Sequence, residues 1–91
     1  MKSSEALRLA RPLIESKENG FVCLALNRVA PGQQRAKNHI RKLLSPNATL
    51  EGWLRDQRGI ETSYERDFDL LRITRLAWID DMIAWHEARG D

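Results

Sequence analysis

The sequence has few of the residues that mark disulfide-stapled, disordered or membrane-spanning chains. It contains one cysteine, Cys23, so no internal disulfide can form, and this usage is typical of a reducing compartment. Three prolines and five glycines, without a low-complexity tract, argue against disorder. No apolar run approaches a membrane span, and the first twenty residues lack the apolar stretch of a secretory signal. We therefore expect a folded cytoplasmic domain that does not bind membranes.

The sequence also has little that could carry catalysis or hold a metal. His39 and His86 are far apart in sequence, and with a single cysteine they form no recognised zinc-binding spacing. Cys23 lies in the most apolar segment, where a reactive thiolate is disfavoured. Neither "NGF" nor "PGQQ" has the glycine spacing of a phosphate-binding loop. We predict that the protein is not an enzyme and has no catalytic residues, cofactor or metal site.

Helical periodicity is present along most of the chain. Its 91 residues fit a single domain, 1–91, with one modest core. Helices are predicted to begin near Ser3, Phe21, Gln33, Leu50 and Ser63, because apolar residues follow each start at helical spacing. The pattern predicts an all-α fold, a compact bundle of four or five helices with a long C-terminal helix that runs from Ser63 to Arg89.

The ends of the first and last helices also have sequence signals. Ser3 and Ser4 can cap the first helix, and Asn19-Gly20 supplies a left-handed stop. Pro12 predicts a kink or a restart within the first helix. Gly90 lies where the last helix is expected to stop.

The apolar segment "FVCLAL", residues 21–26, is equally compatible with a buried strand and a buried helix. No other segment alternates as a strand does, so a lone strand would leave its backbone groups unpaired. We predict a short, fully buried helix that ends before Ala30-Pro31-Gly32, with Cys23 in the core.

The last predicted helix carries apolar residues on two sides. Its broad main face comprises Tyr64, Phe68, Leu71, Trp78, Ile79, Met82 and Trp85. Trp53, in the preceding helix, is predicted to join Trp78 in the core. Arg75 projects near the middle of the main face, where it either pairs with an acid or extends to the edge.

The opposite side of this helix is the predicted partner-binding strip, formed by Leu70, Ile73 and Ala77, with Ala84 farther along. An apolar strip left exposed on a small soluble protein marks a contact site. A second copy of the chain could cover it, giving a homodimer, or a target protein could do so. Intramolecular cover by Leu7, Leu9 and Ile14 is the remaining alternative.

The charge distribution leaves two interpretations open. Residues 1–46 carry nine Lys/Arg and three Asp/Glu, whereas residues 47–91 carry six and ten. The halves can pair with each other inside the fold, or the basic residues can bind nucleic acid through a helix-turn-helix-like segment, 35–58. The second interpretation assigns phosphate contacts to Arg35, Lys37, Arg41, Lys42, Arg55 and Arg58. Against it, the break at 45–49 is longer than a tight turn.

Three segments together resemble the small accessory proteins that tailed phages and prophages encode. They are the apolar "FVCLAL", the turn-to-helix "ATLEGWL" and the terminal "RLAWIDDMIAW". The resemblance implies a protein that binds and inhibits or modulates a host protein, and it implies no shared catalytic residues. We therefore expect a protein-interaction module with a host protein as partner.

Overall fold

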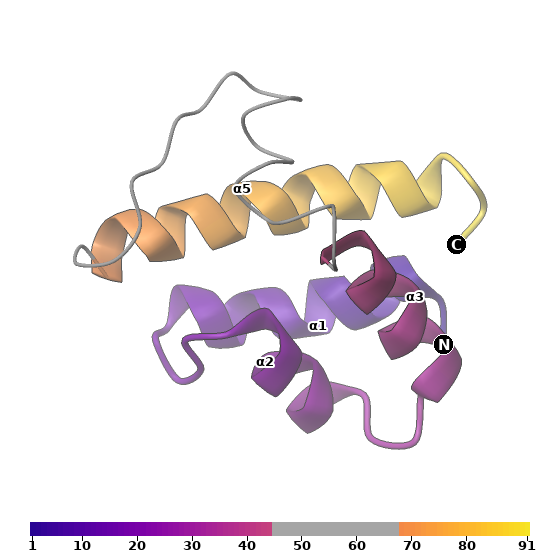
Figure 1. The fold of residues 1–91 in the computed structure, drawn as a ribbon, viewed down its shortest axis with the longest axis horizontal. Helices are drawn as coiled ribbons and strands as arrows, with labels where there is room; N and C mark the ends of the chain where they lie inside the picture. The colour runs from indigo at the N-terminus through magenta and orange to yellow at the C-terminus, as the bar shows by residue number, and fades with distance from the viewer. Residues whose placement is uncertain (45–67) are drawn as a thin grey trace.

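The computed structural model describes residues 1–44 and 68–91, with the side chains of residues 1–43 and 72–91. These residues form four helices and no strand: α1 (Ser3–Glu15), α2 (Val22–Val29), α3 (Gln34–Leu44) and α5 (Phe68–Glu87) (Figure 1). The all-α prediction is confirmed for this part of the chain. The predicted helix near Leu50, including Trp53, Arg55 and Arg58, lies outside the described residues. None of the described helices has the length and apolar character needed to cross a membrane.

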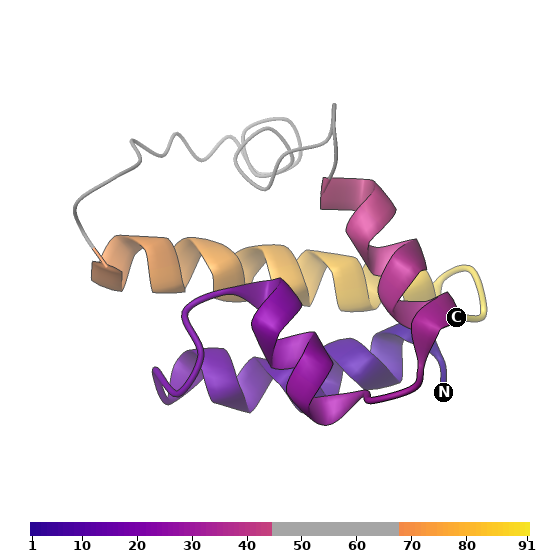
Figure 2. The same cartoon turned by 60° about the horizontal axis from the view of Figure 1, so that its bottom comes forward.

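Helices α1 and α5 run side by side in opposite directions, as Figures 1 and 2 both show. Helices α2 and α3 pack against α1, and α3 approaches the last turns of α5 (Figure 2). The antiparallel pairing brings the start of α1 to the same end of the molecule as Asp91.

The core is built by the apolar faces that the periodicity predicts. Helix α5 contributes Trp78, Ile79 and Met82, which are fully buried. The other helices complete the cluster with Ala6, Leu7, Ala10, Ile14, Val22, Ala25, Leu26 and Ile40. Burial of each large apolar side chain stabilises the fold by roughly 1.5–3 kcal/mol. The predicted core position of Trp78 is confirmed.

Helix α2 is helical as predicted, but the expectation that it is fully buried is wrong. Val22 and Leu26 point into the core, whereas Phe21 is 58 % exposed and Leu24 is 51 % exposed. Cys23 is half-buried. A short helix that rests one face on α1 leaves the residues of its other face in solvent, because side chains point all round a helix.

The end of α1 differs from the sequence-based expectation. The helix continues through Pro12 and ends at Glu15. The left-handed residue is Lys17, with φ 68°, and the stop predicted at Asn19-Gly20 is therefore wrong. The turn closes early because the backbone N–H of Lys17 donates to the carbonyl of Ile14 at 3.2 Å. Ending there satisfies one of the carbonyls that the last turn leaves unpaired.

The predicted partner-binding strip on α5 is only partly exposed. Ile73 is 58 % exposed, whereas Ala77 is half-buried and packs against the core. The side chain of Leu70 lies outside the described part. On α1, Leu7 and Ile14 are buried, but the proposed cover by Leu9 is wrong because this side chain is exposed. Among the strip residues whose side chains the structure describes, Ile73 of α5 is therefore the one that remains accessible to a partner.

Arg75 extends to the edge of the core. Its guanidinium carbon lies 5.0 Å from the centroid of the Phe21 ring, a cation–π distance, and the side chain is half-buried. This placement matches the second of the two alternatives for Arg75, in which the long stem packs and the charge reaches solvent.

Candidate functional site

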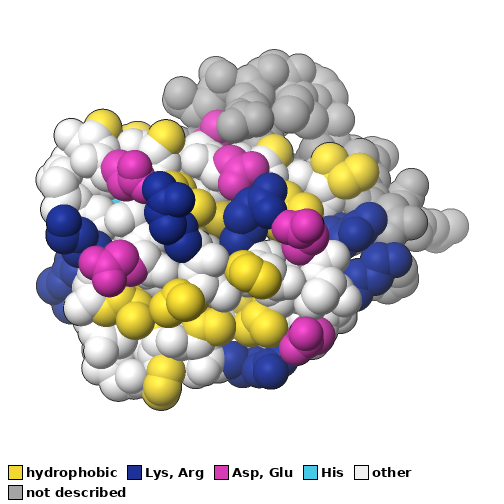
Figure 3. All heavy atoms as spheres, turned by 180° about the vertical axis from the view of Figure 1, so that it is seen from behind, with side chains coloured by type: hydrophobic (Ala, Val, Ile, Leu, Met, Phe, Trp, Pro, Cys, Tyr) yellow, Lys and Arg dark blue, Asp and Glu magenta, His cyan; other side chains and the backbone are white. Residues whose placement is uncertain are grey.

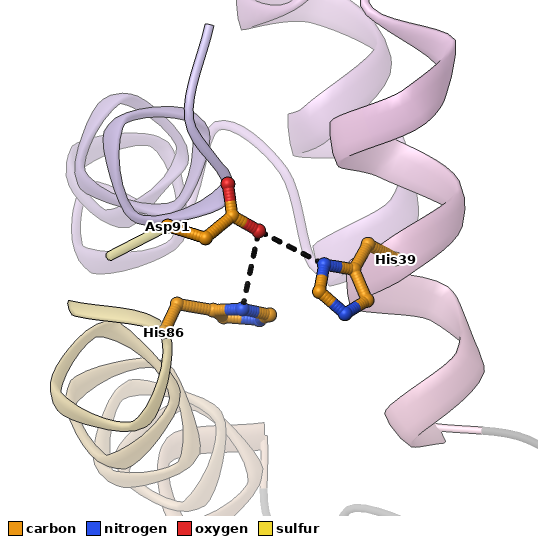
Figure 4. Close-up of side chains that lie close together, drawn as sticks. All are labelled: His39, His86 and Asp91. Atoms are coloured by element: carbon orange, nitrogen blue, oxygen red, sulfur yellow. Dashed lines mark hydrogen bonds and ion pairs between the residues drawn. The ribbon is translucent and has the colours of Figure 1, made fainter. Parts of the chain in front are cut away.

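Three side chains that are distant in sequence meet at one end of the molecule. His39 comes from α3, His86 from the last turn of α5, and Asp91 from the residues after it (Figure 4). One ligating atom from each residue lies within 4.8 Å of those of the other two. We call this group the His–His–Asp cluster.

A tight turn after α5 positions Asp91. The N–H groups of Arg89 and Asp91 both donate to the carbonyl of His86, at 3.0 and 2.9 Å. Gly90 has φ 75°, a left-handed conformation that other residues rarely adopt. The prediction of a helix stop at Gly90 is confirmed, with the helix itself ending at Glu87. The turn directs Asp91 back across the start of α1.

Asp91 caps α1 from the other end of the chain. The N–H of Ser3 donates to Asp91 Oδ1 at 3.1 Å, and the N–H of Ser4 donates to the backbone oxygen of Asp91 at 2.8 Å. The first amides of a helix have no intrahelical acceptor, and the positive end of the helix dipole favours an anion. Asp91 therefore provides the acceptors that α1 needs.

The two serines have a different role from the one predicted. Lys2 is the N-cap residue of α1, and no side-chain capping bond is made there. The Ser3 hydroxyl donates to Asp91 Oδ2 at 2.7 Å, and the Ser4 hydroxyl donates to the Asp91 backbone oxygen at 2.8 Å. The expected capping by Ser3 and Ser4 is thus wrong, because these hydroxyls act as donors to Asp91.

Basic side chains complete the surroundings of the Asp91 carboxylate. Arg35 donates to Oδ1 at 3.0 Å and to Oδ2 at 3.4 Å, and it also donates to the Met1 carbonyl. His39 Nδ1 lies 2.9 Å from Oδ2. The hydrogen bond from Arg35 is the main cause that holds the pKa of Asp91 far below its usual range. The bonds from Ser3 and His39 lower it further, whereas burial opposes them, so Asp91 is ionised at neutral pH.

His86 is the buried member of the cluster. Its side chain is 0 % exposed, and neither ring nitrogen has a hydrogen-bond partner. Nδ1 lies 3.7 Å from Asp91 Oδ2, which exceeds hydrogen-bonding distance. The ring packs edge-on against His39 and Trp85, with centroids 5.1 and 5.0 Å away. Burial is the main cause that lowers the pKa of His86 below 6.5, with the nearby His39 adding to it.

The cluster has the chemistry of a transition-metal ligand set, because two imidazoles and a carboxylate are common ligands of zinc. The sequence-based expectation of no metal site rested on the distance between His39 and His86 along the chain. In the folded chain the two histidines nevertheless lie close together in space. No spacing pattern could have revealed the meeting, because it depends on how α3, α5 and the start of α1 pack.

The basic residues assigned to nucleic-acid binding do not form a single free patch in the part of the chain that the structure describes. Arg35 is bound to Asp91, and Arg41 donates to Asn27 Oδ1 at 2.8 Å. Lys37 is 5 % exposed, so its predicted place on the outer side of α3 is wrong. The long aliphatic part of a lysine side chain can pack as an apolar group, which accounts for the burial of Lys37. Lys42 alone among these four is exposed without a hydrogen bond or ion pair to a described residue.

Ion pairs between the halves of the chain lie along the seam of α1 and α5. Arg8 pairs with Glu87, and Arg11 Nε lies 2.8 Å from Asp80 Oδ1. Figure 3 shows basic and acidic side chains adjacent along this seam, with apolar side chains gathered below them. These ion pairs join the basic first half of the chain to the acidic second half within the fold. They agree with the interpretation in which the opposite charges of the two halves pair with each other.

The sequence matches no protein-family model, and neither the curated proteins nor the solved structures provide a match.

Proposed function

We propose that this chain is a small cytoplasmic protein-interaction module, of the accessory type that tailed phages and prophages encode. It acts by binding a host protein and inhibiting or modulating it, without catalysis of its own. We take the complete fold to be a bundle of four or five helices whose long C-terminal helix supports the binding surface.

The observation that carries this proposal is the exposure of large apolar side chains on α2 and α5. Phe21 is the N-cap residue of α2 and Leu24 lies in its first turn, and both are more than half exposed. Ile73 is equally exposed on α5. Covering such side chains with a partner removes apolar area from water, at about 25 cal/mol per Å². These three residues form the proposed contact surface. Leu70 and Ala77, three residues before and four residues after Ile73, extend it along the same side of α5.

A capture experiment tests the proposal with matched variants. The immobilised full chain is incubated with host lysate, and captured proteins are identified by mass spectrometry. Ile73→Asp and the double variant Phe21→Asp with Leu24→Asp place charges on the surface, whereas Asn38→Asp places one at an exposed position of α3, outside the proposed surface. Circular dichroism verifies that each variant remains helical, and sedimentation reports whether the chain forms a dimer.

We expect the wild type and Asn38→Asp to capture the same host protein, and the surface variants to lose it while remaining folded. Loss of a homodimer in the surface variants alone would identify a second copy of the chain as the partner. Equal capture by all variants would refute the proposed surface. A monomer that captures no protein above a blank resin would refute the interaction module itself.

The alternative, a nucleic-acid-binding regulator, has weaker support. Among its predicted contact residues, Arg35 and Arg41 are engaged within the fold and Lys37 is buried. Salt separates the two functions, because phosphate contacts release counterions and weaken steeply as ionic strength rises. Binding through Phe21, Leu24 and Ile73 is expected to change little.

A further inference from the structure

We propose that the His–His–Asp cluster is a binding site for one divalent transition-metal ion of the zinc class. The ligands are Nδ1 of His39, Nδ1 of His86 and Oδ2 of Asp91, and a water molecule completes a tetrahedral set. The site is independent of the contact surface on α2 and α5, because it shares none of its residues.

The geometry is close to what zinc requires. Zinc bonds to imidazole nitrogen and carboxylate oxygen are about 2.0–2.2 Å long, so ligand atoms on a tetrahedron lie roughly 3.4 Å apart. Here Oδ2 of Asp91 is 2.9 Å from Nδ1 of His39 and 3.7 Å from Nδ1 of His86. One ligand atom from each residue lies within 4.8 Å of those of the other two, and Figure 4 shows both rings directed at the carboxylate. Changes of up to about 1.4 Å in these separations would complete the arrangement.

A second observation is the unsatisfied polarity of His86. A buried polar atom without a partner costs about 1–3 kcal/mol. His86 is fully buried, and both of its ring nitrogens are unpaired. A metal at Nδ1 would give this nitrogen the partner that it lacks.

The groups around Asp91 leave Oδ2 suited to a metal. The Ser3 amide and the shorter of the two Arg35 contacts engage Oδ1, so they hold the carboxylate in place from the other side. The Ser3 hydroxyl on Oδ2 can remain as an outer hydrogen bond. The positive charge of Arg35 opposes a nearby cation, which limits the affinity.

His39 must change its tautomer when the metal binds. In the metal-free protein Nδ1–H donates to the ionised Asp91. Coordination needs the Nδ1 lone pair, so this proton is lost to water while Nε2 takes up another. The side chain of His39 is 42 % exposed, so water can reach the ring.

Zinc titration of the full chain tests the site. Zinc chloride is added in competition with a chromophoric chelator, and Co²⁺ absorption in the visible range reports the coordination geometry. His39→Gln removes a ligand from an accessible position, and Asp91→Asn removes the carboxylate. Cys23→Ala is the matched control, because Cys23 is the only cysteine and the two histidines are both in the cluster.

We expect one zinc per chain in the wild type and in Cys23→Ala, with a melting temperature that rises when zinc is added. His39→Gln should weaken binding by at least about 10-fold, because even outer-shell changes have effects of this size. Unchanged stoichiometry and affinity in His39→Gln, or loss of binding in Cys23→Ala, would overturn the assignment. Absence of zinc binding by the folded wild type would also overturn it, without bearing on the capture of a host protein.

Discussion

Replacing Asp91 by asparagine tests whether this residue joins the two ends of the chain. The substitution keeps the size of the side chain but removes its charge and places an NH₂ group where one carboxylate oxygen was. In either orientation of the amide, NH₂ faces donors from Ser3 and Arg35. Hydrogen bonds to a charged acceptor contribute about 1.5–3 kcal/mol each, and the exposed Arg35 pair contributes less because water screens it. We therefore expect a loss of about 2–3 kcal/mol.

Thermal melting in the presence of a chelator measures this loss without interference from bound metal. A loss of this size should lower the melting temperature by about 8–24 °C in a domain of this length. Asp80→Asn is the matched control, because it also removes an aspartate paired with an arginine, and its side chain is 45 % exposed. This change should cost less than about 1 kcal/mol. Equal melting temperatures for Asp91→Asn and the wild type would refute the capping role.

The difference in stability between the wild type and Asp91→Asn should depend on pH in a defined direction. Folding lowers the pKa of Asp91, whereas in the unfolded chain this carboxyl group has its ordinary pKa of about 3.9. The stabilisation by ionised Asp91 is therefore complete above that value and declines as pH falls below it. We expect the stability gap between wild type and Asp91→Asn to narrow below about pH 4. A gap that widens as pH falls below 4 would contradict the assignment.

Two further substitutions test the core and the turn. Trp78→Ala removes a fully buried indole, and we expect a loss of about 3–5 kcal/mol, which denaturant unfolding would measure; a loss below about 1 kcal/mol would mean that the core is assigned incorrectly. Gly90→Ala should cost about 1 kcal/mol in thermal melting, because the strain comes from φ 75° while a Cβ there meets no atom within 4 Å. Gly90→Asn should cost less, since asparagine tolerates this conformation, and equal stability of all three chains would disprove the strain.

The parts of the fold that the sequence predicted are those that depend on local periodicity. The buried face of α5 follows a 3.6-residue period, so Trp78 and Met82 were assigned correctly to the core. Leu7 and Ile14 of α1 are also buried, but they were named only as one alternative cover for the strip on α5. The same periodicity misplaced Lys37, and the continuous apolar run at residues 21–26 misplaced Leu24. A helical wheel assigns a face to each residue but does not say which neighbouring helix covers it.

The candidate site could not be predicted in the same way. His39, His86 and Asp91 come together only because α1 and α5 are antiparallel and α3 crosses near their common end. Gly90 gave a local signal, because it predicted where the last helix stops. It did not predict that Asp91, the next residue, would cap α1. The serines at the start of α1 indicated a cap, but they gave no sign that the acceptor would come from residue 91.

The most direct test of the proposed function is the affinity for the captured host protein, measured by titration calorimetry at about 50 mM and about 500 mM salt. We predict a dissociation constant that changes by less than about 10-fold between the two conditions, because apolar contacts release few counterions. Ile73→Asp should weaken binding at both salt concentrations, and Asn38→Asp should bind as the wild type does. A fall in affinity of about 10³-fold or more at high salt, with Ile73→Asp unchanged, would contradict the interaction surface and favour phosphate recognition.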